Sequence, residues 1–273
     1  MSTPLTWLYV PGDRPERFAK AAASGADVVL IDLEDAVAPA HKDDARAAAA
    51  AHLAGVPAGP PVHVRINHGE RGRADLEALA HLPGLAGIRV PKVETAAQLD
   101  AIGDLLPEGL GIWVLVESAR GIAAMEEIAA HPRVAGLGLG EQDLASALSL
   151  TAPAAIDHLR LRAVLAAAAT GLPAPAMSVH ANVRDDEGLL AGTRHGRELG
   201  MFGRSVIHPR QIPVVRRAFA PSADEVARAR AIVEAAGATG ARGALALDDG
   251  TFLDRPIVER ARRTLDLAAR LTS

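Results

Sequence analysis

A glutamate directly follows an unbroken apolar stretch of this 273-residue chain. Ile112–Val116 contains five apolar residues in succession, and Glu117 comes next. A continuous run rich in Val and Ile predicts a strand that is buried on both faces, as in a parallel sheet covered by helices. In proteins of that kind, ligands bind beyond the carboxyl ends of the strands. Glu117 is therefore a candidate binding or catalytic residue.

Nearly all the other short apolar runs also end in polar side chains. One charged residue after one strand is most often part of a solvated loop. Many strands that each deliver such a residue to the same rim predict a shared site, with acids and bases mixed. These residues are Asp32, Glu34 and Asp35 after the second run, Arg65 and Asn67 after the third, Lys92 after the fourth, Glu141 and Asp143 after the sixth, and His208 after the eighth.

The acids at this rim predict a metal site. Glu117 and Asp143 follow neighbouring strands, and Mg²⁺ usually accepts two carboxylates together with substrate oxygens and waters. Mn²⁺ has similar preferences. Asp32, Glu34 and Asp35 are expected to orient the bound waters from further out. The alternative for Glu34 and Asp35 is that they cap the next helix or pair with a neighbouring Arg.

Two basic residues at the rim suit an anionic or carbonyl-bearing substrate. The planar fork of Arg65 can hold a carboxylate or thioester oxygen, and Lys92 can act as a point charge. Both side chains are expected at the same edge of the sheet as the acids.

Short apolar runs alternate with alanine-rich helical stretches, which predicts βα units and a parallel sheet. The length slightly exceeds the roughly 250 residues typical of a (β/α)8 barrel. We predict an α/β fold: a (β/α)8 TIM barrel catalytic domain over residues 1–220 and a C-terminal helical extension and lid over residues 221–273. The expected strands are Trp7–Val10, Val28–Leu33, Val62–Ile66, Gly87–Val90, Ile112–Val116, Val134–Leu139, Ala174–Val179 and Ser205–Ile207.

Composition narrows the function. No cysteine occurs, so any metal must be held by oxygen or imidazole, which favours a hard cation. The 29 basic and 33 acidic residues give a formal charge of -4, which disfavours nucleic acid and anionic lipid as partners. Residues 1–12 lack the features of a signal peptide, and no apolar run approaches the ~20 residues of a membrane span. We expect a cytoplasmic protein.

Eight segments in order along the chain resemble the HpcH/HpaI aldolase and citrate lyase family. Within it, the chain is most similar to the stand-alone proteins that are like the citrate lyase β subunit and the malyl-CoA and citramalyl-CoA lyases. Each segment alone is a weak signal, but their order and spacing are specific. They are Val10–Phe18, Asp32–Val37, Val64–Asn67, Val90–Glu94, Val116–Gly121, Gly140–Leu144, Asp185–Leu189 and Ile207–Gln211.

The resemblance implies a Mg²⁺-dependent carbon–carbon lyase that cleaves or condenses a 3-hydroxyacyl-CoA such as malyl-, citramalyl- or citryl-CoA. The products of cleavage would be acetyl- or propionyl-CoA and a 2-oxo acid. It implies that Glu117 and Asp143 bind the metal and the substrate through it, and that Arg65 contacts the substrate near the thioester.

The resemblance also implies a place for coenzyme A and a lid. Arg14, Arg17 and Lys20 are candidates for the CoA phosphates, with plain surface charge as the alternative. Gly250–Pro256 resembles the lid of the family, whose aspartate, here Asp254, is the acid/base and acts across subunits of a homotrimer. We expect a homotrimer or hexamer; the alternative for Asp254 is that it caps the helix that begins near Pro256.

Two departures from the family pattern bear on the substrate. Many CoA lyases of the family carry an aspartate just before the Val-His of the seventh strand, where this chain reads Ala176–His180 and includes Met177. Asn182 stands where an acid is common. Two other functions therefore stay open: a metal-dependent pyruvate aldolase that acts without CoA, and a non-catalytic or acyl-carrier-dependent subunit.

Overall fold

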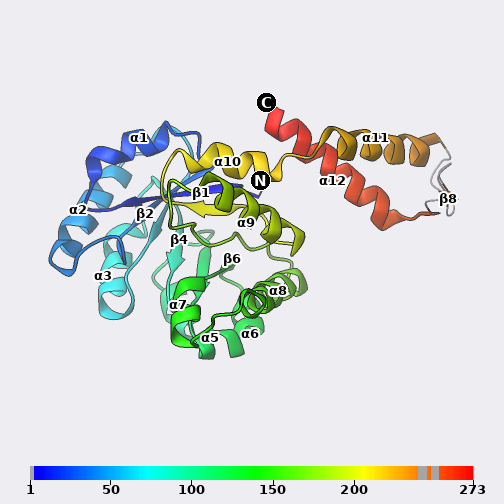
Figure 1. Ribbon diagram of the computed structural model, residues 1–273. Helices are drawn as coiled ribbons and strands as arrows, with labels where there is room; N and C mark the ends of the chain where they lie inside the picture. The colour runs from blue at the N-terminus through cyan, green and yellow to red at the C-terminus, as the bar shows by residue number, and fades with distance from the viewer. Residues whose placement is uncertain (1–2, 239–244, 247–251, 273) are drawn as a thin grey trace. The chain divides into compact units, whose positions relative to one another are not determined.

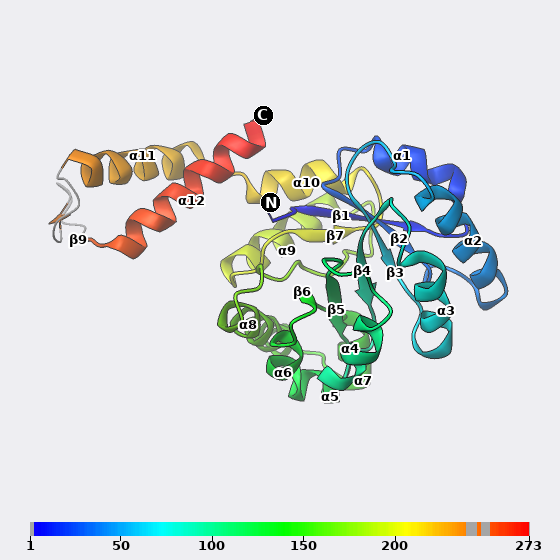
Figure 2. The same ribbon diagram turned by 180° about the vertical axis from the view of Figure 1, so that it is seen from behind.

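The protein is described from a computed structural model, which covers residues 3–238, 245–246 and 252–272 (Figure 1). The chain divides into two compact units, Met1–Val215 and Arg216–Ser273. The first unit contains a curled parallel sheet with helices on its outside (Figures 1 and 2). No described helix is both long enough and apolar enough to cross a membrane.

Seven parallel strands form the sheet, in the order β6-β5-β4-β3-β2-β1-β7. Most of their residues are buried, as their continuous apolar runs predict. The α/β class is confirmed, but seven strands are observed where eight were expected. The strands are β1 (Thr6–Pro11), β2 (Val28–Asp32), β3 (Val62–Arg65), β4 (Leu85–Val90), β5 (Ile112–Val116), β6 (Val134–Leu139) and β7 (Arg204–Val206).

The prediction of a strand over Ala174–Val179 is wrong. This segment forms only isolated parallel bridges, from Ala176 to Gly138 and from Met177 to Arg204. Pro173 and Pro175 have no backbone N–H, so they cannot donate to a ladder of hydrogen bonds.

The helices follow the strands in the alternation that the sequence predicts. Lys42–Leu53 forms one continuous helix, whereas residues 119–129 are divided into two short helices. The helices and 3-10 turns of this unit are η1 (Pro15–Arg17), α1 (Phe18–Ala22), η2 (Pro39–His41), α2 (Lys42–Leu53), α3 (Gly69–Leu79), α4 (Ala96–Gly103), α5 (Ala119–Ala123), α6 (Met125–Ala129), α7 (Glu141–Ala147), α8 (Pro153–Ala169), α9 (Asp186–Glu198) and α10 (Gln211–Phe219).

Aromatic side chains fill part of the space inside the curled sheet. The Trp7 ring lies 4.6 Å from that of Trp113 and 5.2 Å from that of His63, measured between centroids. Two glycines make room for them: a Cβ at Gly87 would lie 2.3 Å from the His63 ring, and one at Gly136 would lie 2.1 Å from the Trp113 ring. We call Trp7, His63 and Trp113 the aromatic plug.

The second unit contains helices α11 (Ala223–Ala238) and α12 (Arg255–Thr272), which pack against each other. Their contact is built on a small cluster of buried residues, Ala229, Ile232 and Ala261. Between the helices, β8 (Leu245–Ala246) pairs antiparallel with β9 (Phe252–Leu253). Most of the predicted linker Gly237–Gly243, and Gly250 and Thr251 of the predicted lid, lie outside the described residues.

Candidate active site

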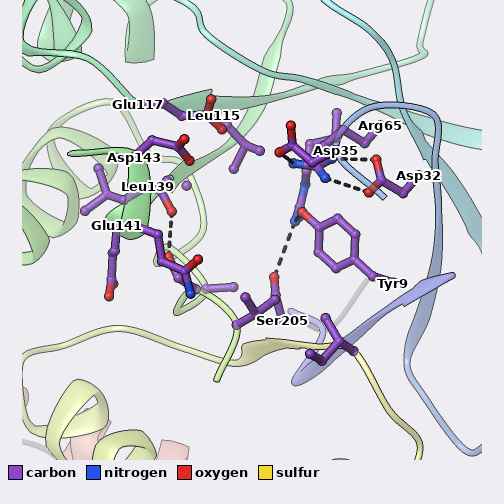
Figure 3. A pocket seen from close by; sticks show the side chains of 18 of the residues that line it. Tyr9, Asp32, Asp35, Arg65, Leu115, Glu117, Leu139, Glu141, Asp143 and Ser205 are labelled. Carbon is purple, nitrogen blue, oxygen red and sulfur yellow. Dashed lines mark hydrogen bonds and ion pairs between the residues drawn. The ribbon is translucent and has the colours of Figure 1, made fainter. Parts of the chain in front are cut away.

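A cavity of about 450 Å³ opens at the carboxyl ends of the strands. It is lined by residues from β1 to β7 and from the loops that follow them. Figure 3 shows the carboxylates of Glu117 and Asp143 on one side and Arg65, Asp32 and Asp35 on the other. Six of the residues that the sequence predicts at a shared rim line this cavity: Asp32, Asp35, Arg65, Glu117, Glu141 and Asp143.

Arg65 is held by acids of the loop after β2. Its Nε donates to Asp32 Oδ1 at 2.7 Å and its Nη2 to Asp32 Oδ2 at 2.6 Å, which is a bidentate pair. Burial alone would lower the pKa of Arg65, but the hydrogen bonds and charge of Asp32 outweigh it and raise this pKa. The guanidinium is thus permanently charged and fixed in orientation.

The loop that carries these acids is itself fixed from two sides. Asp32 accepts hydrogen bonds from the backbone N–H groups of Glu34 at 2.9 Å and Ala36 at 3.2 Å. The buried Lys42 of α2 donates through Nζ to the carbonyl oxygens of Leu33 at 2.7 Å and Glu34. Burial lowers the pKa of Lys42, while the surrounding acids oppose that shift. Lys42 was not identified from the sequence.

Glu34 and Lys92 complete this group. Lys92 Nζ donates to Glu34 Oε1 at 2.8 Å, whereas Arg65 Nη1 lies 2.9 Å from Glu34 Oε2 without the alignment of a hydrogen bond. Burial raises the pKa of Glu34, and the two cations oppose the shift. We call Asp32, Glu34, Arg65 and Lys92 the paired cluster.

Asp35 is the exposed member of this neighbourhood. Its Oδ2 accepts from Arg65 Nη1 at 3.1 Å, but its side chain is 64% exposed. An ion pair this open to water contributes little, so a substrate oxygen can replace Asp35 on Arg65 at small cost.

Glu117 has a different environment from the paired cluster. Glu117 is 7% exposed, and no hydrogen bond or ion pair joins its carboxylate to a described residue. Burial raises the pKa of Glu117 to about 7, and the charges of Glu34 and Asp143 raise it further against Arg65 and Lys92. No cationic side chain of the described residues forms an ion pair with this carboxylate, so it is available to bind a metal cation.

Gly140 makes the space for the Glu117 carboxyl group. A Cβ at position 140 would lie 2.5 Å from Glu117 Cγ and 3.0 Å from its Oε1. Any larger residue would displace the carboxylate, so the glycine after β6 is required by close approach and not by a turn.

Asp143 lies on α7, on the same side of the cavity as Glu117 (Figure 3). It is exposed, whereas Glu141 on the same helix is engaged by Arg160 through hydrogen bonds of 2.9 and 2.6 Å. Among the acids that the sequence places after β6, only Asp143 is thus left available to a ligand in the described structure.

Glu117 and Asp143 fit the magnesium site that the sequence predicts. Two carboxylates beside open space suit a cation that keeps several waters. Throughout the described residues, no group of three His, Asp or Glu side chains is close enough to form a complete protein cage. Substrate or water oxygens would have to supply the remaining ligands.

A second cavity of about 420 Å³ lies beside the first and shares Tyr9, Pro11, Arg17 and Ile207 with it. Lys20 and His208 line this second cavity as well. Arg14 lines neither cavity; its side chain is 56% exposed and lies 4.0 Å from Asp13.

The structure also places residues about which the sequence left questions. Met177 is fully buried and lines the first cavity, whereas Asn182 is exposed and accepts a hydrogen bond from the N–H of Arg184. Asp254 is exposed, and its Oδ1 accepts from the N–H of Ile257 at 3.1 Å, so it caps α12. Arg89, which sequence reasoning missed, lines the first cavity from β4.

Comparisons with known proteins identify the family that this chain is similar to. A family model described as HpcH/HpaI aldolase/citrate lyase matches residues 5–209. The citrate lyase subunit beta-like protein of Mycobacterium tuberculosis is 40% identical, over 98% of this chain and 96% of its own. The (3S)-malyl-CoA thioesterase of Cereibacter sphaeroides is 38% identical, over 94% of this chain and 92% of its own.

Solved structures show the same likeness. The crystal structure of CitE from M. tuberculosis in complex with magnesium, acetoacetate and coenzyme A superimposes with a TM-score of 0.84 at 37% identity, covering 98% of this chain and 99% of that one. The citrate lyase beta subunit of the same organism, complexed with oxaloacetate and magnesium, gives a TM-score of 0.70, covering 81% and 98%.

Proposed function

The chain belongs to the HpcH/HpaI aldolase/citrate lyase family, and from this we propose that it is a Mg²⁺-dependent carbon–carbon lyase acting on a 3-hydroxyacyl-CoA. The substrate would be a thioester such as malyl-, citramalyl- or citryl-CoA, cleaved to acetyl- or propionyl-CoA and a 2-oxo acid or formed from them. The similar CitE of Mycobacterium tuberculosis was crystallised in complex with magnesium, acetoacetate and coenzyme A, which supports magnesium and coenzyme A as ligands here.

The proposal is supported most directly by the different environments of Glu117 and Arg65 in the cavity. Glu117 is buried without a cation, while Arg65 is buried with its charge oriented by Asp32. A metal-binding carboxylate must be free to bind, and an electrophilic guanidinium must be preorganised. The two requirements are met on opposite sides of one cavity (Figure 3).

The chemistry to be performed is a retro-Claisen cleavage. Breaking the bond between the hydroxyl-bearing carbon and the thioester α-carbon leaves an enolate on the thioester side and a carbonyl on the other. Arg65 stabilises the charge that develops on the thioester oxygen. Asp35 leaves Arg65 Nη1 when the substrate binds, which its exposure makes inexpensive.

Magnesium held by Glu117 and Asp143 would act as Lewis acid and template for the oxygens of the acid portion. The residues of this chain hold those two carboxylates in position: Gly140 leaves room for the first, and α7 carries the second. Residues of the second cavity, Arg17 and Lys20, would bind CoA phosphates.

A carboxylate must also move a proton, and we assign this role to Asp254. In this proposal, the compact unit Arg216–Ser273 acts as a lid and donates Asp254 across subunits of a homotrimer or hexamer. The test mixes inactive Asp254→Asn chains with inactive Glu117→Ala chains under exchange conditions. Recovered activity is expected; none, despite verified hetero-oligomers, would rule out donation in trans.

The closure of the barrel is part of the same proposal. Strands β6 and β7 are the two outer strands of the sheet. Ala176 forms a parallel bridge to Gly138 of β6, and Met177 forms one to Arg204 of β7. We assign this segment as the reduced eighth member of a (β/α)8 barrel.

A cleavage screen tests the reaction. Malyl-, citramalyl-, citryl- and β-methylmalyl-CoA are incubated with the purified chain and Mg²⁺, and the products are separated. Acetyl- or propionyl-CoA with a 2-oxo acid is expected. Free CoA with the intact hydroxy acid would instead indicate a thioesterase, as one relative is named. Cleavage only of free hydroxy-oxo acids, or only with an acyl carrier, would support the aldolase or subunit alternatives.

A further inference from the structure

Arg89 brings a positive charge into the curled sheet without an acid to balance it. It lies on β4 and is only 5% exposed. Its Nη1 donates to Tyr9 Oη at 3.2 Å and to Ser205 Oγ at 3.4 Å, and both acceptors are hydroxyl groups. No described carboxylate forms an ion pair with it. Burying a charge costs several kcal/mol, so a buried guanidinium normally has an ionic partner.

The other neighbours of Arg89 do not supply a negative charge. Its Cζ lies 4.8 Å from the ring centroid of Trp7 and 5.9 Å from that of Tyr9. Such contacts are worth about 0.5–2 kcal/mol, less than the cost of burial. Burial and the charge of Arg89 lower the pKa of His63 to about 3, so this ring is neutral at ordinary pH.

Arg65 shows how the Nε and Nη2 atoms of Arg89 could bind a carboxylate. The two arginines are register partners on β3 and β4, and both line the first cavity. Arg65 uses its Nε and Nη2 edge to bind Asp32 in a bidentate pair. The described structure gives the same edge of Arg89 no acceptor, because its two hydrogen bonds both start from Nη1.

The side chain of Arg89 extends across the inside of the curled sheet. Its side chain reaches from β4 to Tyr9 of β1 and Ser205 of β7, which lie on the other side of β3 and β2 in the sheet. It also contacts the aromatic plug through Trp7. Arg89 lines the same cavity as Glu117 and Asp143, so a ligand bound at these two acids can also reach Arg89.

We propose that Arg89 is a specificity-determining residue that binds a second carboxylate on the acid portion of the substrate. The inference rests on the proposed function and narrows it to thioesters whose 2-oxo acid product is a diacid, as from citryl-CoA. A carboxylate matches the planar fork of Arg89 and neutralises its buried charge. A monoacid such as pyruvate leaves that charge unbalanced.

Calorimetric binding of 2-oxo acids in the presence of Mg²⁺ tests the inference without turnover. Oxaloacetate and pyruvate are titrated into the full chain, Arg89→Met, Arg89→Lys and the exposed control Arg73→Met. We expect the unmodified chain to prefer oxaloacetate by about tenfold or more, about 1.4 kcal/mol. Arg89→Met should lose this preference while its pyruvate affinity stays within about threefold; Arg89→Lys should retain part of it, and Arg73→Met all of it.

Equal losses for both acids in Arg89→Met, or no preference in the unmodified chain, would overturn the assignment. Circular dichroism checks that the variants fold; if Arg89→Met does not, the oxaloacetate-to-pyruvate ratio of Arg89→Lys decides, and an unchanged ratio overturns the assignment. The proposed function fails separately: cleavage of none of the four thioesters, with the binding preference intact, would refute the lyase and leave Arg89 as a diacid-binding residue.

Discussion

The paired cluster and Glu117 differ in how their buried charges are balanced: the charges of the cluster are paired within the protein, whereas that of Glu117 is not. In the paired cluster after β2 to β4, every charged side chain contacts an opposite charge at 2.6–2.9 Å. After β5, Glu117 is about as buried as Glu34 but has no described hydrogen-bond or ion-pair partner, and its pKa is raised to about 7.

This difference indicates two roles: one group of residues has a fixed geometry before a ligand arrives, and the other is available to bind a cation. Charges that are paired within the protein keep their geometry before a ligand arrives, which favours catalysis by an oriented electrostatic field. A charge without a partner destabilises the empty protein and gains most when a cation binds. The paired cluster is thus expected to orient the substrate, and the unpaired acids to bind the metal.

The largest effect is expected from removing an unpaired acid. Glu117→Ala or Asp143→Ala should lower kcat at least about 10³-fold, or about 4 kcal/mol, because the metal and the substrate oxygens on it lose their position. Steady-state cleavage rates measure this loss. Circular dichroism should show an intact fold, and near-normal rates in both variants would contradict the metal assignment.

The second effect concerns stability against pH. The folded protein keeps the Glu117 proton up to about pH 7, whereas the unfolded chain loses it near its ordinary value of 4.5. The contribution of Glu117 to the free energy of unfolding therefore falls as pH rises from 4.5 to 7. Glu117→Gln should remove this fall and be more stable at pH 8 by ~1–3 kcal/mol.

Urea unfolding at pH 5 and pH 8, without metal, measures the effect as the difference between the two proteins. Taking the difference removes the contribution of other titrating groups. If Glu117→Gln and the unmodified protein show the same pH dependence, Glu117 is not an unpaired buried acid.

Arg65→Lys tests the paired cluster. One ammonium cannot replace the Nε and Nη2 fork that binds Asp32, so the cluster loses its geometry while keeping its charge. We expect kcat/KM to fall by more than about tenfold, about 1.4 kcal/mol. Mg²⁺ affinity should change little, and a kcat/KM equal to that of the unmodified enzyme would exclude an oriented role for Arg65.

Lys92→Met should have the smallest effect. The Lys92 side chain is 48% exposed, and a pair so open to solvent contributes about 1 kcal/mol or less. Thermal unfolding measures the change. A much larger loss would mean that Glu34 depends on Lys92 for its place and that the paired cluster is less rigid than its contacts indicate.

The sequence predicts most strands of the sheet and several of the residues that line the cavity. Val134–Leu139 and Ile112–Val116 are strands over the ranges expected. A continuous apolar run is typical of a strand that is buried on both faces of a parallel sheet. The segment Ala174–Val179 fails because its prolines remove N–H donors, so hydrophobicity alone overstated it.

The residues that were missed depend on long-range geometry. Arg89 interrupts an apolar run, and only the curl of the sheet brings it to Tyr9 and Ser205. Lys42 begins a helix, where lysine is usually solvated, yet here it holds two carbonyl groups of a loop. The pairing of Arg65 with Asp32 was not predicted from the sequence, for the same reason.

Calorimetric titration of Mg²⁺ tests the division of the rim most directly. The unmodified chain is compared with Glu117→Ala, Asp143→Ala, Arg65→Lys and the exposed-acid control Glu126→Ala. The account predicts that binding is lost in the first two variants and kept in the last two. Unchanged Mg²⁺ affinity in both Glu117→Ala and Asp143→Ala would contradict it.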